Sequence, residues 1–228
     1  MTPSSEGVFV YNGKRVSMKN LVVLISGWTG QPHLWRNMSV LFQDFGYDVV
    51  IAEMPNNGFG DIQESACNVA LMIQEVRPYY DKVVLCGHSM GGLIARVIIQ
   101  HLEVTEIDAY VSLGTPHQGT HTAKLAPWSE SAKQMCRNSL FIDTLNEQPW
   151  PEDVPALGLQ AQFEAVVLPR SSAKIDFGLN QVIPGCDHVT LPLLKRTFFE
   201  IWGWLTYSVF EENGPSERHG FISNFNSK

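Results

Sequence analysis

The sequence is poor in the features that mark several classes of protein. Lys and Arg number 16 against 23 Asp and Glu, which gives a net charge of −7 and no basic stripe, so we expect no nucleic-acid partner. No cluster of histidines and carboxylates has the spacing of metal ligands, and no second glycine-rich loop opens a helix. We therefore expect neither a metal nor a cofactor. The cysteines are widely spread, form no C-x-x-C pair and read as individual thiols, with Cys86 as a small core residue: Cys67, Cys86, Cys136 and Cys186.

Long apolar runs are also missing. The most apolar late stretch, residues 198–210, is interrupted by Glu200 and is too short to span a bilayer, so we expect no integral membrane segment. The first residues, Met1 to Glu6, lack a basic region followed by an apolar run, which argues against a secretory signal. We expect a cytoplasmic protein; if a signal had been trimmed from the chain, the protein would be secreted instead.

Apolar runs and helical repeats alternate along most of the chain. With 228 residues, no internal repeat and no linker, the sequence predicts a single domain with its core at about 7–207 and a flexible polar tail at 211–228. The alternation predicts an α/β fold, a mostly parallel sheet with helices on both faces. A hairpin turning at Asn12-Gly13 precedes it. Strands are expected at 21–25, 47–52, 83–86, 107–113, 156–162 and 179–184, and helices at 34–45, 62–76, 92–102 and 191–207.

Residues 120–155, called the excursion below, interrupt this alternation. They contain four prolines and helical patches near 132–136 and 141–145, and we expect them to form a small helical cap over the sheet's edge. Their apolar residues are interpreted first as a cover for the sheet's edge and second as an apolar surface for a bound molecule: Leu125, Trp128, Met135, Leu140, Phe141 and Leu145. The aromatic residues of the last helix are interpreted first as core and second as a lipid contact.

The stretch Val83–Arg96 carries the strongest signal for chemistry. An apolar strand enters Gly87-His88-Ser89-Met90-Gly91, and a helical pattern leaves it. This spacing is that of a nucleophile elbow, a tight strand-to-helix turn that presents a serine hydroxyl in a cleft. A side chain at either flanking glycine would clash, because the strand and the helix approach each other closely there. The pattern therefore indicates Ser89 as a nucleophile.

Other candidate residues also follow predicted strands. Trp28, the loop 114–119 and His188 all come just after a strand, and in parallel sheets the carboxyl ends of the strands share one rim. A serine needs a hydrogen-bonded base near neutral pH, and His188, between the last strand and the last helix, is the best candidate. His88 lies in the elbow's variable position and His117 in a strand-end loop. The remaining histidines lie outside any matching motif: His33, His101, His121 and His219.

Taken together, these motifs resemble the α/β-hydrolase superfamily, most strongly its compact bacterial lipases and esterases. The resemblance covers about residues 20–207 and rests on four motifs in the family's order: Gly27-Trp28-Thr29-Gly30, Gly87-His88-Ser89-Met90-Gly91-Gly92, Gly114-Thr115-Pro116-His117-Gln118-Gly119 and Pro184-Gly185-Cys186-Asp187-His188. It implies the α/β-hydrolase fold and the chain order serine, acid, histidine. His117 stands where the family also has a structural histidine.

The resemblance leaves the triad acid open. The family places it after the penultimate strand, before a short apolar stretch and a proline, and Glu164-Ala165-Val166-Val167-Leu168-Pro169 matches that pattern with Glu where Asp is commoner. Glu164 is therefore the favoured acid, and Asp176, in the loop before the last strand, is the rival. Asp187 adjoins His188 and is poorly placed to reach its ring, while Asp153 precedes the strand.

The same resemblance implies an oxyanion hole of two backbone N–H groups, those of Met90 and Trp28. Ser26 departs from the family, which often has histidine before that glycine. Because the donor is backbone, the departure weakens the match only slightly. The Trp28 indole could line the acyl pocket or simply pack.

We therefore expect a serine carboxylic-ester hydrolase of the esterase or lipase kind, with Ser89, His188 and Glu164 catalytic and an apolar acyl ester, small or lipid, as substrate. Two alternatives stay open: a thioesterase or acyltransferase with the same triad, and a binding protein that keeps the fold without turnover. The sequence does not indicate an oligomeric state.

Overall fold

A computed structural model describes residues 8–11, 14–17, 19–30, 32–102 and 106–210. Its centre is a six-stranded, wholly parallel sheet in the order β4-β3-β5-β6-β7-β8, preceded by an antiparallel hairpin, β1-β2. The strands are β1 Val8–Tyr11, β2 Lys14–Ser17, β3 Lys19–Ile25, β4 Asp48–Ala52, β5 Tyr80–His88, β6 Ala109–Leu113, β7 Ala156–Ala161 and β8 Leu179–Ile183. The predicted α/β-hydrolase sheet is confirmed, and the expected polar tail at 211–228 lies outside the described residues.

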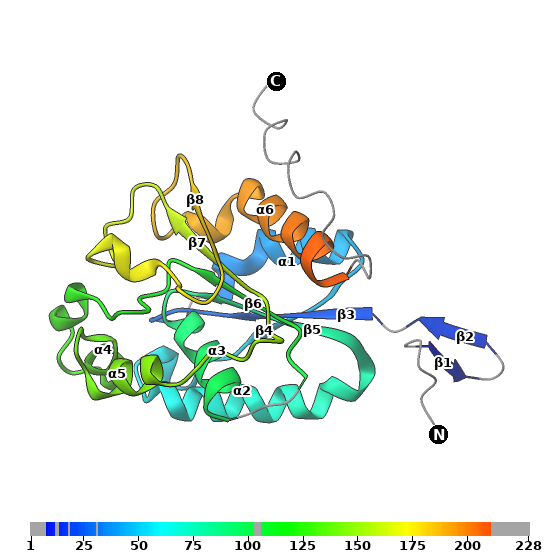
Figure 1. The fold of residues 1–228 in the computed structure, drawn as a ribbon, viewed down its shortest axis with the longest axis horizontal. Coiled ribbons are helices and arrows are strands. Elements are labelled where there is room, and N and C mark those ends of the chain that lie inside the picture. Colours follow the sequence, from blue (N-terminus) through cyan, green and yellow to red (C-terminus); the bar gives the residue numbers. More distant parts are fainter. Residues whose placement is uncertain (1–7, 12–13, 18, 31, 103–105, 211–228) are drawn as a thin grey trace.

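Helices cover both faces of this sheet (Figure 1): α2 and α3 lie below it in that view, and α1 and α6 lie above. The α-helices are α1 Arg36–Asp44, α2 Ile62–Val76, α3 Met90–Gln100, α4 Glu130–Met135, α5 Leu140–Glu147 and α6 Lys195–Leu205. Short 3₁₀ segments occur at Pro32–Trp35, Pro55–Gly58, Arg77–Tyr79, His121–Leu125, Arg170–Ala173 and Leu191–Leu193, and a π-helical turn at Thr206–Phe210 follows α6.

The sheet separates two apolar cores, and β3 shows how. Leu21, Val23 and Ile25 point into the core under α2 and α3, while Val22 and Leu24 point into the core under α1 and α6. All five are fully buried, because a strand covered on both faces alternates its side chains between two apolar layers. The unbroken apolar run in the sequence follows from this double burial.

The register aligns the strand ends at one edge. Ile25 pairs with Gly87, His88 with Leu113, and Leu113 with Leu159. The chain therefore leaves β3, β5, β6, β7 and β8 on the same side, at the left end of the sheet in Figure 1. This rim carries the loops that the sequence singled out.

The excursion contains α4 and α5, close to the two helical patches expected there. Met135 and Leu145 belong to the core under α2 and α3. This position agrees with the prediction that they cover the sheet. Leu125, Trp128 and Leu140 differ, since they are 78, 74 and 83% exposed. The last helix is also divided between core and surface: Phe198 and Ile201 are buried, and Phe199 is about half exposed.

Candidate active site

Ser89 forms the turn between β5 and α3 in a strained backbone conformation. Its φ of 54° and ψ of −122° place a non-glycine residue in a region that costs about 1–3 kcal/mol and that recurs at functional sites. The Ser89 N–H donates to the Leu113 carbonyl at 2.8 Å, which holds the turn against the neighbouring strand. The side chain is thereby presented at the rim beyond β5.

The glycines around Ser89 allow three backbones to meet. A Cβ on Gly87 would lie 2.4 Å from the carbonyl carbon of Gly91, and a Cβ on Gly91 would lie 2.1 Å from the Ile25 carbonyl oxygen. Neither position has room for a side chain. The elbow glycines therefore set how closely α3 approaches β5 and β3, which is the packing reason that the sequence pattern implied.

His188 lies in the loop after β8, and its ring is buried against the end of β6. The imidazole Nδ1 is 2.9 Å from Glu164 Oε2, with both side chains buried. A Cβ on Gly114, which follows β6, would lie 3.0 Å from this Nδ1 and 3.3 Å from the Glu164 oxygen. The glycine after β6 thus leaves room for the pair.

The Glu164 carboxylate is fixed at both oxygens. Oε1 accepts from the N–H groups of Val166, at 2.8 Å, and Val167, at 2.9 Å, while Oε2 faces His188. Burial raises the pKa of Glu164, but the hydrogen bond and charge of His188 and the two N–H groups together outweigh burial, so that the pKa lies below its usual value. The side chain is therefore an ionised acceptor at neutral pH.

This ionisation state determines the tautomer of His188. A carboxylate carries no proton, so Nδ1–H must donate to it, and Nε2 is left as the acceptor nitrogen. A neutral imidazole oriented in this way can accept a proton from a hydroxyl at Nε2.

Trp28 follows β3 in a loop that packs against the elbow. A Cβ on Gly27 would lie 2.9 Å from Ser89 Cβ, so the two loops are in direct contact. Thr29 and Gly30 both have positive φ, and Gly30 N–H closes the turn by donating to the Gly27 carbonyl at 3.0 Å. Met90 is the first residue of α3, where N–H groups have no acceptor inside the helix. The loop that carries Trp28 and the elbow that carries Met90 are therefore packed against each other.

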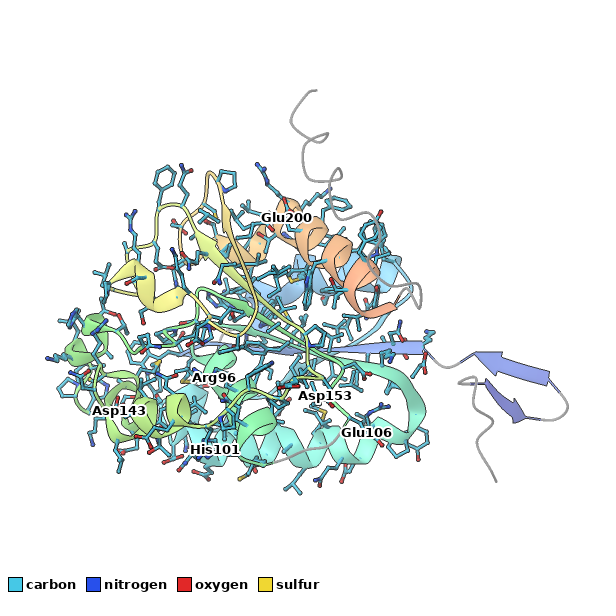
Figure 2. All side chains as sticks on the ribbon, in the orientation of Figure 1. Arg96, His101, Glu106, Asp143, Asp153 and Glu200 are labelled. Atoms are coloured by element: carbon cyan, nitrogen blue, oxygen red, sulfur yellow. The ribbon has the colours of Figure 1, made fainter. Side chains whose placement is uncertain are left out.

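The rival carboxylates lie elsewhere. Asp176 is exposed and lines a cavity of about 320 Å³ together with Arg96 of α3. Asp187 is exposed and accepts from the N–H and hydroxyl of Thr190, which shapes its own turn. Asp153, labelled in Figure 2, is exposed and precedes β7. Of the carboxylates considered, Glu164 is the one that contacts His188.

The sequence did not predict that His88 contacts His188. Its Nε2 lies 2.9 Å from the His188 carbonyl oxygen, and the two rings are 4.8 Å apart between centroids. Burial, and then the charge of His188 when protonated, lower the pKa of His88 to about 3. The neutral ring therefore donates from Nε2 to the backbone of the candidate base. The position of His88 next to Ser89 was the one sequence feature that pointed to the site. No sequence feature indicated its partner, which lies 100 residues away.

His117 has a different environment from the candidate base. Its ring is buried, Nε2 lies 3.2 Å from Ser112 Oγ, and its carbonyl accepts from Asn146 of the excursion at 3.0 Å. Burial and the charge of Arg96 lower its pKa well below the usual value. These contacts fit the structural role expected for it.

Two further features are missing from the described part of the chain. No group of three or more His, Cys, Asp or Glu side chains there is arranged to hold a metal ion. Among the described helices, none combines the length and apolar character needed to cross a membrane.

A family comparison identifies the fold. A family model described as the alpha/beta hydrolase fold matches residues 20–135, about half of the chain, including β3, the elbow and β6. The chain belongs to the α/β-hydrolase family. The comparison with curated protein sequences gives no match.

Solved structures share this architecture at low sequence identity. A mature lipase of Bacillus licheniformis has a TM-score of 0.71 at 18% identity, over 81% of this chain and 92% of that one. Lipase B of Aspergillus fumigatus has a TM-score of 0.60 at 21% identity, over 72% and 44%. A bromoperoxidase of Bacillus anthracis also has 0.60, at 15% identity, over 82% and 92%. At these identities the likeness shows the fold alone.

Proposed function

We propose that the protein is a serine carboxylic-ester hydrolase that acts on apolar acyl esters. The observation that carries the proposal is the buried Nδ1–Oε2 contact of 2.9 Å between His188 and a doubly held Glu164, on the same rim as a strained serine. A carboxylate that orients a histidine near such a serine is the arrangement that nucleophilic acyl transfer requires. The lipases among the structural neighbours are consistent with it.

In the acylation step, the Ser89 hydroxyl attacks the ester carbonyl as His188 Nε2 takes its proton. The carbonyl oxygen becomes an oxyanion, which the N–H groups of Trp28 and Met90 bind. Glu164 stabilises the imidazolium without taking its proton. The oxyanion then collapses, His188 protonates the leaving alcohol, and Ser89 is left as an acyl ester.

In the deacylation step, water replaces the alcohol. His188 removes a proton from the water as its oxygen attacks the acyl ester, and the same two N–H groups bind the second oxyanion. Collapse returns the proton to Ser89 Oγ and releases the carboxylic acid. The reaction is therefore a balanced hydrolysis of ester to acid and alcohol.

The test is covalent labelling together with turnover. A fluorophosphonate should modify Ser89, and p-nitrophenyl esters of increasing chain length should be hydrolysed. Ser89→Ala should abolish both, whereas Ser171→Ala, at an exposed serine, should change neither. Labelling elsewhere, or unchanged hydrolysis by Ser89→Ala, would refute the proposal.

A further inference from the structure

The Trp28 side chain is held by a residue outside its own loop. Its indole N–H donates to Ser129 Oγ at 3.1 Å, and its ring meets Phe59 edge-on at 5.2 Å between centroids. Ser129 belongs to the excursion, 101 positions further along the chain, and is buried. The residue whose backbone N–H is the candidate oxyanion donor is thus attached to the excursion.

The Ser129 hydroxyl is itself oriented. Its proton can go to the Phe59 carbonyl at 3.0 Å, and its oxygen accepts from the Ala132 N–H at 3.3 Å as the N-cap of α4. Ser131 Oγ, at 2.9 Å, is a second acceptor available to this proton because the Ser131 hydroxyl donates to Gly58, and the two lone pairs of Ser129 accept from the Ala132 and Trp28 N–H groups. Because all four partners are protein groups, the serine is a fixed acceptor for the indole.

The excursion is joined to the loop after β4 by further hydrogen bonds. Ser131 Oγ donates to the Gly58 carbonyl at 2.7 Å, and Glu130 N–H donates to the Phe59 carbonyl at 3.1 Å. Gln134 donates to Asp61 Oδ2 at 2.9 Å and accepts from the Ile62 N–H at 2.8 Å. Several hydrogen bonds therefore hold α4 against the loop after β4 and the start of α2.

The loop after β4 in turn contacts the oxyanion loop and the elbow. A Cβ on Gly58 would lie 3.1 Å from Met90 Cε and 3.3 Å from the Gly27 carbonyl oxygen. The start of α4, the loop after β4, the oxyanion loop and the first residue of α3 are consequently packed in series.

We propose that Ser129 is a positioning residue that fixes the Trp28 backbone N–H for the oxyanion, and that the start of α4 is a fixed support in the reaction rather than a moving lid. The inference rests on the proposed function. Oxyanion donors are effective because they are aimed before charge develops, so loosening one lowers turnover more than substrate binding.

The test compares Ser129→Ala with Ser139→Ala. Ser139 is the N-cap of α5 in the same excursion: it accepts from Ile142 N–H at 3.2 Å, donates to the Gln134 carbonyl at 2.5 Å and has no contact with Trp28. Both variants lose an N-cap, but only Ser129→Ala releases the indole. We expect Ser129→Ala to lower kcat about tenfold to a hundredfold with KM little changed, below the about 10²–10³-fold effect of deleting a donor. Ser139→Ala should keep kcat within about twofold.

Trp28→Phe supplies a second, independent route, because it keeps an aromatic ring and removes the N–H. It should reproduce the loss of kcat, and the Ser129→Ala/Trp28→Phe double variant should lose no more than either single one, as expected for two changes that break one interaction. Additive losses, or equal kcat in Ser129→Ala and Ser139→Ala, would overturn the role of Ser129.

Amide hydrogen exchange separates this inference from the proposed function. Exchange at residues 27–30 should be faster in Ser129→Ala than in Ser139→Ala, whether or not an ester is turned over. If the wild-type protein hydrolyses no ester but this difference is seen, the proposed function fails and the positioning of the loop by Ser129 stands. Unchanged exchange at 27–30 would refute the positioning even if esters are hydrolysed.

Discussion

Replacing Glu164 with Gln changes one atom of the candidate triad, and the geometry dictates how the amide must lie. The Oε1 site faces two N–H donors, those of Val166 and Val167 at 2.8 and 2.9 Å, so the amide oxygen has to occupy it. The NH₂ group is then directed at His188 Nδ1, where the carboxylate oxygen lay at 2.9 Å. An amide donor requires Nδ1 to be the unprotonated nitrogen, which moves the ring proton to Nε2.

A histidine protonated at Nε2 has no lone pair there to accept the Ser89 proton. We therefore expect Glu164→Gln to lower kcat by about 10⁴-fold, the loss typical of a triad whose acid is replaced by its amide. The fold should survive, because the amide satisfies the same N–H donors. Turnover of p-nitrophenyl butyrate, with thermal unfolding as a check on the fold, measures both effects.

Asp176→Asn is the matched control, since Asp176 is exposed and lines the separate cavity beside Arg96. It should retain wild-type kcat. A loss of less than about tenfold in Glu164→Gln, or a large loss in Asp176→Asn, would refute the assignment of Glu164 and the tautomer argument based on it.

Two further predictions concern His88. His88→Leu removes the donor to the His188 carbonyl and should lower kcat about tenfold, the kind of loss expected when a catalytic group is slightly misplaced. His88→Gln offers an amide N–H in its place and should recover part of this loss. Steady-state kinetics measure both variants, and equal kcat values for the two would contradict the prediction. The pKa of His88 is about 3 in the folded protein against 6.5 ordinarily, so the unfolded chain binds more protons between these values and stability falls as the pH drops from about 6.5 towards 3. The His88 contribution is about 1.4 kcal/mol per pH unit near pH 5, and urea unfolding at pH 6 and 4.5 should show a shallower dependence in His88→Gln; equal slopes would refute the buried neutral state.

The fold could be predicted from the sequence where local signals and burial agree. The helix expected at 62–76 is α2 with the same bounds, because Asp61 caps it and Arg77-Pro78 ends it. The last helix starts later than expected: Leu191–Leu193 is a 3₁₀ turn and Leu194 is extended, so α6 begins at Lys195. Its apolar spacing does not distinguish the two kinds of turn.

The residues of the candidate site could be proposed from the sequence, but the contacts that hold their side chains in place could not. Spacing after strands indicated Ser89 and His188, whereas Glu164 was favoured through the family resemblance. The N–H pair that fixes Glu164, the His88 contact and the Ser129–Trp28 bond each depend on how loops meet in space. No local pattern encodes such contacts between distant segments.

The position of β8 in the sheet affects when, during folding, the candidate site is completed. β8, which leads to His188, is the last of the described strands and lies at an edge of the sheet, where it pairs with β7 alone among them. A chain that had formed only β3, β5 and β6 would contain Ser89 but would lack His188, its proposed base. Under the proposed function, activity would return during refolding only when the C-terminal third has docked. Recovery of turnover would thus time the final step of folding, and a ribosome-bound chain shorter than β8 would be inert toward esters.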